Sequence, residues 1–345
     1  MSEPLLQIKD LAVRFRTDEG EVRAVDGVSF SVERGEVVAV VGESGSGKSV
    51  TGMTLMGLTR GPNAQISGSA RLDGKELLTM SNRELRAVRG NDIAMVFQDP
   101  MSSLNPVYRV GDQIVEQIRT HEQVSKAQAM ARAVELMERV GVPRAAERLR
   151  SYPHEFSGGM RQRVMIAMAL SCSPKLLIAD EPTTALDVTI QAQILEELRQ
   201  LRSETNAGII LVTHDLAVVA DIADRVVVMY SGRVVEQGTL DQLFYDPQHP
   251  YTWGLLGSIT RVDSDRSARL PAIDGMPPSL LAPPSGCHFA PRCPHAFARC
   301  SEVPELLARI PDAPGHLDRC WLDVEQKRAR RLVDGRIGLA APVQA

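Results

Sequence analysis

The sequence lacks a long apolar segment, an export signal and a strong excess of either charge. Its longest apolar runs, VVAVVG and VMIAMAL, are far shorter than the roughly 18 residues that a membrane-spanning helix needs. The first ten residues, MSEPLLQIKD, do not join a basic segment to an apolar one, as a secretory signal does. The net charge of −4 offers no general attraction for nucleic acid. Together these absences predict a soluble cytoplasmic protein.

Disorder over the whole chain is also excluded, because 43% hydrophobic and 24% charged residues make an ordinary globular composition. The 345 residues suffice for two domains, or for one large domain with an appendage. Cysteine is scarce, with five residues, yet four of them lie in one short stretch near the C-terminus: Cys287, Cys293, Cys300 and Cys320. Without an export signal, this group is not expected to form disulfides.

The order of apolar patterns predicts an α/β fold up to about residue 240. Continuous, valine- or leucine-rich runs are typical of strands buried on both faces, whereas apolar residues at steps of three and four indicate helices. The predicted strands lie at residues 5–15, 23–36, 36–42, 176–180 and 208–215, and a hairpin turning at Ser231-Gly232 spans residues 225–238. The predicted helices lie at residues 126–142, 157–174 and 188–204.

Residues 241–345, here called the extension, differ in composition from the rest of the chain. Ten prolines lie between Pro271 and Pro314, and these exclude regular helices and long strands from that region. Residues 246–252, DPQHPYT, are interpreted as a linker. The basic segment 325–336 is expected to be a solvated surface helix.

A glycine-rich loop between the buried strand 36–42 and a helix carries the strongest chemical signal. Residues 42–49, GESGSGKS, match the pattern G-x-x-x-x-G-K-[ST] and are here called the phosphate loop. Its glycines (Gly42, Gly45, Gly47), together with Ser44, let backbone N–H groups converge on phosphate oxygens at a helix N-terminus. Lys48 is expected to reach the β- and γ-phosphates, and the hydroxyl of Ser49 is expected to hold Mg²⁺.

Polar side chains follow the buried strands at the edge where α/β sheets place their ligands. Asp180 ends one strand and is expected to hold Mg²⁺ through water, while Glu181 is expected to polarise the attacking water as general base. His214 and Gln98 also follow apolar runs, although a single histidine after such a run is more often structural.

A further segment, FSGGMRQR (residues 156–163), lies at the start of the predicted helix 157–174. Ser157 suits an N-cap, and the pair Gly158 and Gly159 leaves backbone N–H groups bare, as in an anion site. Taken by themselves, these residues favour an ordinary capped helix.

The order of these motifs resembles that of the nucleotide-binding subunit of an ABC transporter over about residues 5–240. The resemblance implies a P-loop NTPase fold, with a RecA-like core, an antiparallel β subdomain and a helical subdomain at about residues 100–172. It implies that Gln98 senses Mg²⁺ and nucleotide and faces the membrane subunits, and that His214 contacts the γ-phosphate. Phe15 would stack on adenine, and Ala185-Leu186-Asp187 would form the D-loop.

The same resemblance implies that two subunits pack head to tail, so that Ser157, Gly158 and Gly159 of one subunit cap the ATP held by the other. The Ser-Gly-Gly motif is here called the signature. One chain carries one phosphate loop and one signature, so the complete site requires a second copy or a paralogous partner. Phe156 and Met160 depart from the commoner signature residues, but the Ser-Gly-Gly is intact. Because Glu181 and His214 are both present, we expect a subunit that hydrolyses ATP.

The extension is similar to that of the ATPase subunits of oligopeptide and dipeptide importers, through QHPYTWGLLGSIT and GCHFAPRCPHAFARC. That similarity implies two different ATPases beneath two membrane permeases, at the cytoplasmic face of the membrane, with an external peptide-binding protein. It leaves the cargo open, since related systems carry nickel, glutathione and other solutes. Soluble ABC ATPases of ribosomes or DNA usually fuse two cassettes or insert a coiled coil, which this chain lacks. A redox sensor built on the cysteines is a third reading, which the intact phosphate site argues against.

The four cysteines of the extension are interpreted as metal ligands. Their spacings of 5, 6 and 19 residues contain no C-x₂₋₄-C pair, which disfavours a usual zinc site. Four thiolates on an irregular loop favour a [4Fe–4S] cluster, although the ordinary ferredoxin spacings are absent. Zinc, with a histidine such as His288, His295 or His316 in place of a cysteine, and four free thiols remain the alternatives.

Overall fold

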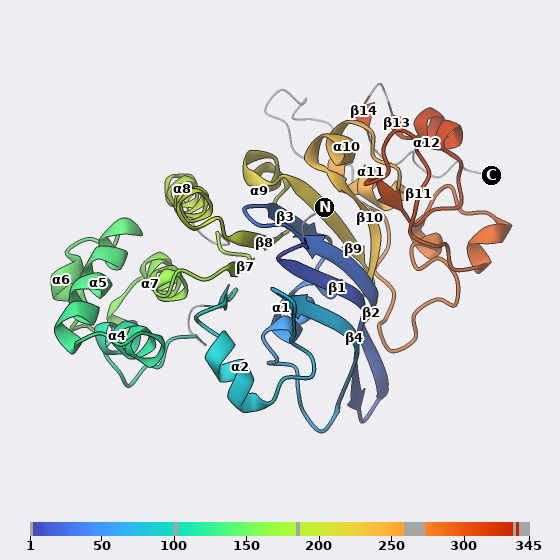
Figure 1. The fold of residues 1–345 in the computed structure, drawn as a ribbon. Coiled ribbons are helices and arrows are strands. Elements are labelled where there is room, and N and C mark those ends of the chain that lie inside the picture. The colour runs from blue at the N-terminus through green and yellow to red at the C-terminus, as the bar shows by residue number, and fades with distance from the viewer. Residues whose placement is uncertain (1–2, 100–102, 184–186, 259–272, 334–335, 338–345) are drawn as a thin grey trace.

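The computed structural model describes residues 3–99, 103–183, 187–258, 273–333 and 336–337. Two sheets form its centre (Figure 1). The larger has the strand order β11-β12-β10-β9-β3-β8-β7-β6, and the smaller has the order β2-β1-β4-β5. Among the described residues, no helix is both long enough and apolar enough to cross a bilayer.

The larger sheet is parallel in its centre, where β6, β7, β8, β3 and β9 pair in the same direction. Its central strands are buried on both faces, as their continuous apolar sequences predict. The strands of this sheet are β3 (Val37–Val41), β6 (Ile93–Val96), β7 (Leu176–Asp180), β8 (Gly208–Thr213), β9 (Arg225–Tyr230), β10 (Arg233–Thr239), β11 (Leu307–Ala308) and β12 (Leu317–Asp318).

The smaller sheet is antiparallel and packs against the larger one through an apolar core that includes Leu11, Val25, Val40 and Val227. Its strands are β1 (Leu6–Thr17), β2 (Gly20–Val32), β4 (Ala64–Leu72) and β5 (Lys75–Glu76). A separate two-stranded sheet pairs β13 (Leu332–Val333) with β14 (Arg336–Ile337).

Helices α4, α5, α6 and α7 gather at one side of the sheets, and the extension lies at the other (Figure 1). A second core, which includes Ile114, Met137 and Ile166, joins these helices to one face of the larger sheet. The helices are α1 (Lys48–Leu55), α2 (Asn82–Val88), α4 (Val110–His121), α5 (Lys126–Arg139), α6 (Ala145–Arg148), α7 (Gly158–Leu170), α8 (Val188–Thr205), α9 (Leu216–Ile222), α10 (Leu240–Tyr245), α11 (Pro250–Gly257) and α12 (Val324–Arg330).

The extension packs against the rest of the chain far more closely than its composition suggests. The interpretation of residues 246–252 as a linker is wrong, because this stretch enters helix α11, and both Tyr251 and Trp253 are fully buried. Pro250 occupies the first turn of that helix, where its missing N–H costs nothing. Tyr251 belongs to a third core, shared by β3, β9 and Phe289.

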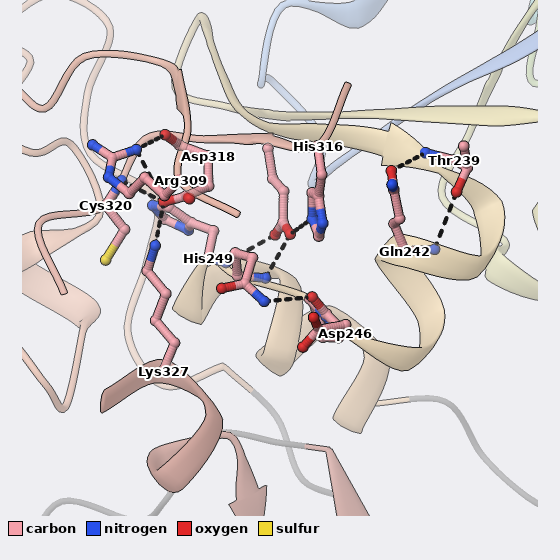
Figure 2. Close-up of polar contacts among 12 residues, drawn as sticks. Thr239, Gln242, Asp246, His249, Arg309, His316, Asp318, Cys320 and Lys327 are labelled. Atoms are coloured by element: carbon pink, nitrogen blue, oxygen red, sulfur yellow. Dashed lines mark hydrogen bonds and ion pairs between the residues drawn. The ribbon is translucent and has the colours of Figure 1, made fainter. Parts of the chain in front are cut away.

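Helix α12 is not simply a solvated surface helix. Lys327 is fully buried, and its ammonium lies 2.6 Å from a carboxylate oxygen of Asp318 on β12 (Figure 2). On the same helix, Arg328 forms an exposed ion pair with Asp246. A basic sequence predicts exposure on average, but one well-paired lysine can be buried, because its charge is neutralised in place.

Other expectations for these regions are confirmed. The hairpin between β9 and β10 turns at Ser231 and Gly232, and both have positive φ, at 46° and 79°. Within residues 273–314, the only regular elements described are two short 3₁₀ helices (Ala290–Arg292 and Ala298–Ser301) and the two-residue strand β11.

Candidate active site

The phosphate loop follows β3 directly and ends in the first turn of α1. Two of its glycines lie too close to neighbouring backbone for a side chain. A Cβ on Gly42 would lie 2.1 Å from the carbonyl oxygen of Met229, and one on Gly47 would lie 2.4 Å from that of Ala24. Both also have positive φ, at 150° and 98°. Glycine at these positions therefore lets the loop pack beneath β2 and β9 while its tip stays exposed.

Lys48 lies inside this loop and is buried. Its ammonium donates to the carbonyl oxygens of Gly42 (2.8 Å) and Glu43 (2.9 Å). Burial lowers the pKa of Lys48, while the nearby carboxylates of Glu181 and Asp180 oppose that effect. The loop thus holds a cation at the point where its backbone N–H groups also gather.

Ser49 and Asp180 meet across the end of β7. The hydroxyl of Ser49 donates to Oδ1 of Asp180 at 3.0 Å, and Asp180 is only 4% exposed. Burial raises the pKa of Asp180, and the charge of Glu181 adds to that rise, whereas the hydrogen bond from Ser49 opposes it. A hydroxyl and a buried carboxylate are oxygen donors of the kind that Mg²⁺ prefers, so the pair fits the predicted metal site.

Glu181 follows β7 and has the left-handed φ of 48°. Such a backbone is strained for a residue with a side chain, and strain of this kind is concentrated at functional sites. Its Oε2 accepts from Nε2 of Gln98 at 3.0 Å, and its Oε1 lies 3.1 Å from Nδ1 of His214. Three residues predicted from separate strand ends thus form one connected group beside Lys48.

The signature residues begin helix α7. Ser157 caps the helix, because its hydroxyl accepts from the backbone N–H of Met160 at 3.3 Å. Ser157 and Gly158 are exposed, and a Cβ on Gly158 would meet no atom within 4 Å. The start of this helix therefore presents open backbone on the surface.

Gln162, on the same helix, has a role that sequence reasoning missed. Its side chain is buried, and its Nε2 donates to the carbonyl oxygen of Pro182 at 2.6 Å. Pro182 directly follows Glu181. The signature helix therefore holds the segment that carries the predicted general base, and no periodicity in the sequence signals this contact.

The roles predicted for Phe15 and Asp187, at the adenine and in the D-loop, stay predictions. Phe15 lies on β1 and packs, partly buried, against the core between the sheets. Asp187 caps α8 through a hydrogen bond from the backbone N–H of Ile190, at 3.0 Å. Ala185 and Leu186, the other residues of the predicted D-loop, lie outside the described residues.

Residues 287–320, here called the cysteine loop, surround a small cavity. All four cysteines of the extension line it, together with apolar side chains such as Phe289 and Leu322. Burial is the main cause that raises the pKa of Cys293 to about 12 and that of Cys320 to about 12. Within the described parts of the chain, no group of three or more His, Cys, Asp or Glu side chains is arranged to hold a metal ion. The thiols share a cavity without forming a ready coordination shell.

A groove of about 680 Å³ lies between the strand β6 region and helices α4 and α7. Phe97, next to Gln98, forms part of its wall, and Tyr108 lies at its edge with 58% of its surface exposed. The side chains that line the groove include Arg89, Gln113, Glu116 and Met165.

Comparison with known proteins agrees with this geometry. The family described as ABC transporter matches residues 25–184, and the family described as oligopeptide/dipeptide transporter, C-terminal region, matches residues 235–300. An oligopeptide transport ATP-binding protein of Salmonella typhimurium is 52% identical, over 93% of this chain and 95% of that protein. A dipeptide transport ATP-binding protein of Bacillus subtilis is 50% identical, over 96% of this chain and 98% of that protein.

Solved structures of ABC transporter ATP-binding proteins resemble this fold. A dimeric ATP-binding cassette in a post-hydrolysis state, bound to ADP and Pi, superposes with a TM-score of 0.63 at 26% identity, over 68% of this chain and 98% of that one. A protein from Clostridium perfringens that is part of an ABC transporter complex has a TM-score of 0.58 at 29% identity, over 71% of this chain and 92% of that one.

Proposed function

The chain belongs to the ABC transporter ATP-binding proteins of the oligopeptide and dipeptide branch, and from that premise we propose that it hydrolyses ATP to drive peptide uptake across the cytoplasmic membrane. The observation that supports this most strongly is the group formed by Glu181, Gln98 and His214 next to Lys48. Such a group can bind a triphosphate and activate a water, which a purely structural fold does not need.

The phosphate loop would bind ATP through its backbone N–H groups, the N-terminus of α1 and the ammonium of Lys48. Lys48 would exchange its contacts with the loop carbonyls for phosphate oxygens. Ser49 and Asp180, with Gln98, would hold Mg²⁺, which when bound neutralises charge on the β- and γ-phosphates. Phe15 would face the adenine.

Glu181 would accept a proton from the attacking water while the water oxygen bonds to the γ-phosphorus and the bond to the β–γ bridging oxygen breaks, which leaves ADP and phosphate. Gln98 and His214 would hold the two oxygens of this carboxylate in orientation, and His214 would also contact the γ-phosphate. Most of the catalysis would come from positioning and electrostatics.

A second ATPase subunit would complete the site. Ser157, Gly158 and Gly159 are exposed or partly exposed at the start of α7, and they would cap the ATP held by a partner, with Asp187 near the same interface. A paralogous subunit in a heterodimer is the proposed partner, and a second copy of this chain is the alternative. Closure on ATP and reopening after hydrolysis would move the permeases between outward- and inward-facing states.

The groove beside Gln98 would receive a cytoplasmic segment of a membrane permease. It is open and mixed in polarity, and its wall includes Phe97, the neighbour of the Gln98 that contacts Glu181. A permease seated there could affect the orientation of the general base, which would couple transport to hydrolysis. The chain would then lie at the cytoplasmic face of the membrane, with an external peptide-binding protein delivering cargo.

The cysteine loop would carry a [4Fe–4S] cluster, with zinc as the less favoured alternative. Support comes from the convergence of Cys287, Cys293, Cys300 and Cys320 on one cavity. A cluster would need the thiols to move into a coordination shell and lose their protons. We also propose the division into a nucleotide-binding domain, residues 1–240 with the helical subdomain at about 100–172, and the extension, residues 241–345.

Reconstitution tests the function. The chain, its permeases, its paralogous ATPase and its binding protein would be placed in proteoliposomes with ATP at the cytoplasmic side. We expect Mg²⁺-dependent phosphate release and accumulation of labelled di- or oligopeptides that stops without ATP. Absence of hydrolysis would contradict the ATPase assignment. Hydrolysis with uptake of nickel or glutathione, but not of peptides, would contradict the cargo alone.

A further inference from the structure

Glu43 is the second residue of the phosphate loop, and it connects this loop to the extension. Its backbone N–H donates to the hydroxyl of Tyr251 at 2.7 Å, and its carbonyl oxygen accepts from the ammonium of Lys48 at 2.9 Å. Its carboxylate accepts from both terminal nitrogens of Arg292, at 2.6 and 3.0 Å. One residue therefore links the lysine of the phosphate site to two side chains of the extension.

Both partners of Glu43 in the extension are themselves firmly held. Tyr251 is fully buried in the first turn of α11, with its ring centroid 4.6 Å from that of Tyr230. The Arg292 side chain is only 5% exposed and also donates to the carbonyl oxygens of Ile273 (3.0 Å) and Asp274 (2.9 Å). The phosphate loop is thus tied to points that have little freedom to move.

The pairing of Arg292 with Glu43 has the geometry of a strong contact. Two parallel N–H···O bonds join a planar guanidinium to a carboxylate, an arrangement that fixes direction as well as distance. The two residues are 249 positions apart in sequence. Arg292 directly precedes Cys293, so the contact begins inside the cysteine loop.

A loop that is already in its bound shape loses less conformational freedom when the ligand arrives. The carbonyl oxygen of Glu43 also helps to place Lys48. Resting on the proposed binding of ATP at this loop, we propose that Arg292 and Tyr251 are positioning residues for ATP: by fixing Glu43 they hold the phosphate loop in its phosphate-binding shape. The cysteine loop thereby becomes a determinant of nucleotide affinity.

Two simpler explanations predict different results. If Arg292 only attaches the extension, then another contact that joins the extension to residues 1–240 would matter equally. If Arg292 only neutralises the charge of Glu43 near the anionic phosphates, then removal of both charges would restore binding. A contact between Arg319 and Val234 provides the control for attachment. Nε of Arg319, in the extension, donates to the carbonyl oxygen of Val234 on β10 at 2.9 Å, away from the phosphate loop.

The test uses the full-length chain and measures the Kd for a fluorescent ATP analogue, together with KM and kcat for ATP in the assembled transporter. We expect Arg292→Ala to raise the Kd and KM about tenfold, with kcat changed less than about twofold, since Glu181 lies elsewhere. Arg292→Lys, which keeps the charge without the planar fork, should fall between Arg292→Ala and the wild type. Arg319→Ala, which removes a contact between the extension and β10 away from the phosphate loop, should stay within about twofold of the wild type.

The double variant Arg292→Ala/Glu43→Gln separates position from charge. We expect it to bind ATP as weakly as Arg292→Ala, and recovery of wild-type affinity would overturn the proposal. An unchanged Kd in Arg292→Ala, or an equal loss of affinity in Arg319→Ala, would overturn it as well. A wild-type chain that binds no ATP would instead contradict the proposed function.

Tyr251→Phe keeps the test decisive even if Arg292→Ala does not fold. This variant retains the buried ring and removes only the hydroxyl that accepts from Glu43, so that one backbone N–H of the loop loses its partner. We expect the Kd for ATP to rise about threefold. A folded Tyr251→Phe variant with wild-type affinity would show that the extension does not position the loop.

Discussion

His214 and Glu181 follow neighbouring parallel strands, β8 and β7, and 3.1 Å separates Nδ1 of His214 from Oε1 of Glu181. Gln98, which follows β6, donates to the other oxygen of the same carboxylate. Three adjacent strands of one sheet are therefore followed by three side chains that meet at Glu181. Both oxygens of Glu181 are engaged, so this carboxylate has a defined orientation in the fold.

Glu181→Gln is expected to keep ATP binding and to lower turnover about 10²- to 10⁴-fold, because the amide has the same shape but cannot accept a proton. Phosphate release at saturating ATP gives the rate, and a fluorescent ATP analogue gives the affinity. Glu196→Gln is the matched control, since Glu196 is an exposed carboxylate on α8 that pairs with Arg199. Turnover of Glu181→Gln at the wild-type rate would show that another group is the base.

Gln162→Ala is expected to lower kcat several-fold with little change in the KM for ATP. The substitution leaves the carbonyl oxygen of Pro182 without its buried donor and loosens the segment that follows Glu181. Gln200→Ala serves as control, because the Gln200 side chain donates to Glu204 on the exposed side of α8. If KM rose and kcat did not change, Gln162 would act on binding and not on the placement of Glu181.

Lys327→Met is expected to lower the free energy of unfolding by about 3–5 kcal/mol, because it leaves the buried carboxylate of Asp318 without its closest cation. Arg328→Ala on the same helix breaks an exposed pair and should cost less than about 1 kcal/mol. Urea unfolding followed by tryptophan fluorescence suits this test, since both tryptophans, Trp253 and Trp321, lie in the extension. Equal losses in the two variants would contradict the prediction.

Anaerobic purification is expected to yield a brown protein with about four iron atoms per chain. Replacement of any one of Cys287, Cys293, Cys300 or Cys320 by serine should reduce the iron content sharply. Cys172→Ser is the control, because Cys172 is buried near the end of α7, outside the cysteine loop. A colourless protein with one zinc would favour the zinc alternative, and a metal-free folded protein would contradict both.

Much of the site could be predicted from sequence, because its signals are local. The phosphate loop is one continuous motif, and Asp180, Glu181 and His214 each follow a continuous apolar run. The convergence of such residues follows from general geometry, since parallel strands place their carboxyl ends at one edge of the sheet. The contacts of Gln98 and His214 with Glu181 agree with that reasoning.

The remaining features depend on contacts between distant residues that no local pattern encodes. The burial of Tyr251 follows from its contacts with Tyr230 and Phe289, not from the polar and proline-rich sequence around it. The pairing of Arg292 with Glu43 joins two charged residues that are, separately, ordinary surface types. Lys327 shows the same limit, because its burial depends on Asp318 being in place.

The short pairing of β12 with β10 protects the larger sheet from aggregation through its edge. Without β12 and β11, β10 would be the edge strand of the larger sheet. Its free backbone N–H and C=O groups could then pair with a strand of another chain. Leu317 and Asp318 pair with Gln237 and Glu236, and the two-residue strand β11 then forms a new edge too short to serve as a template. A chain cut at residue 240 would expose β10 along its length and would be prone to aggregation.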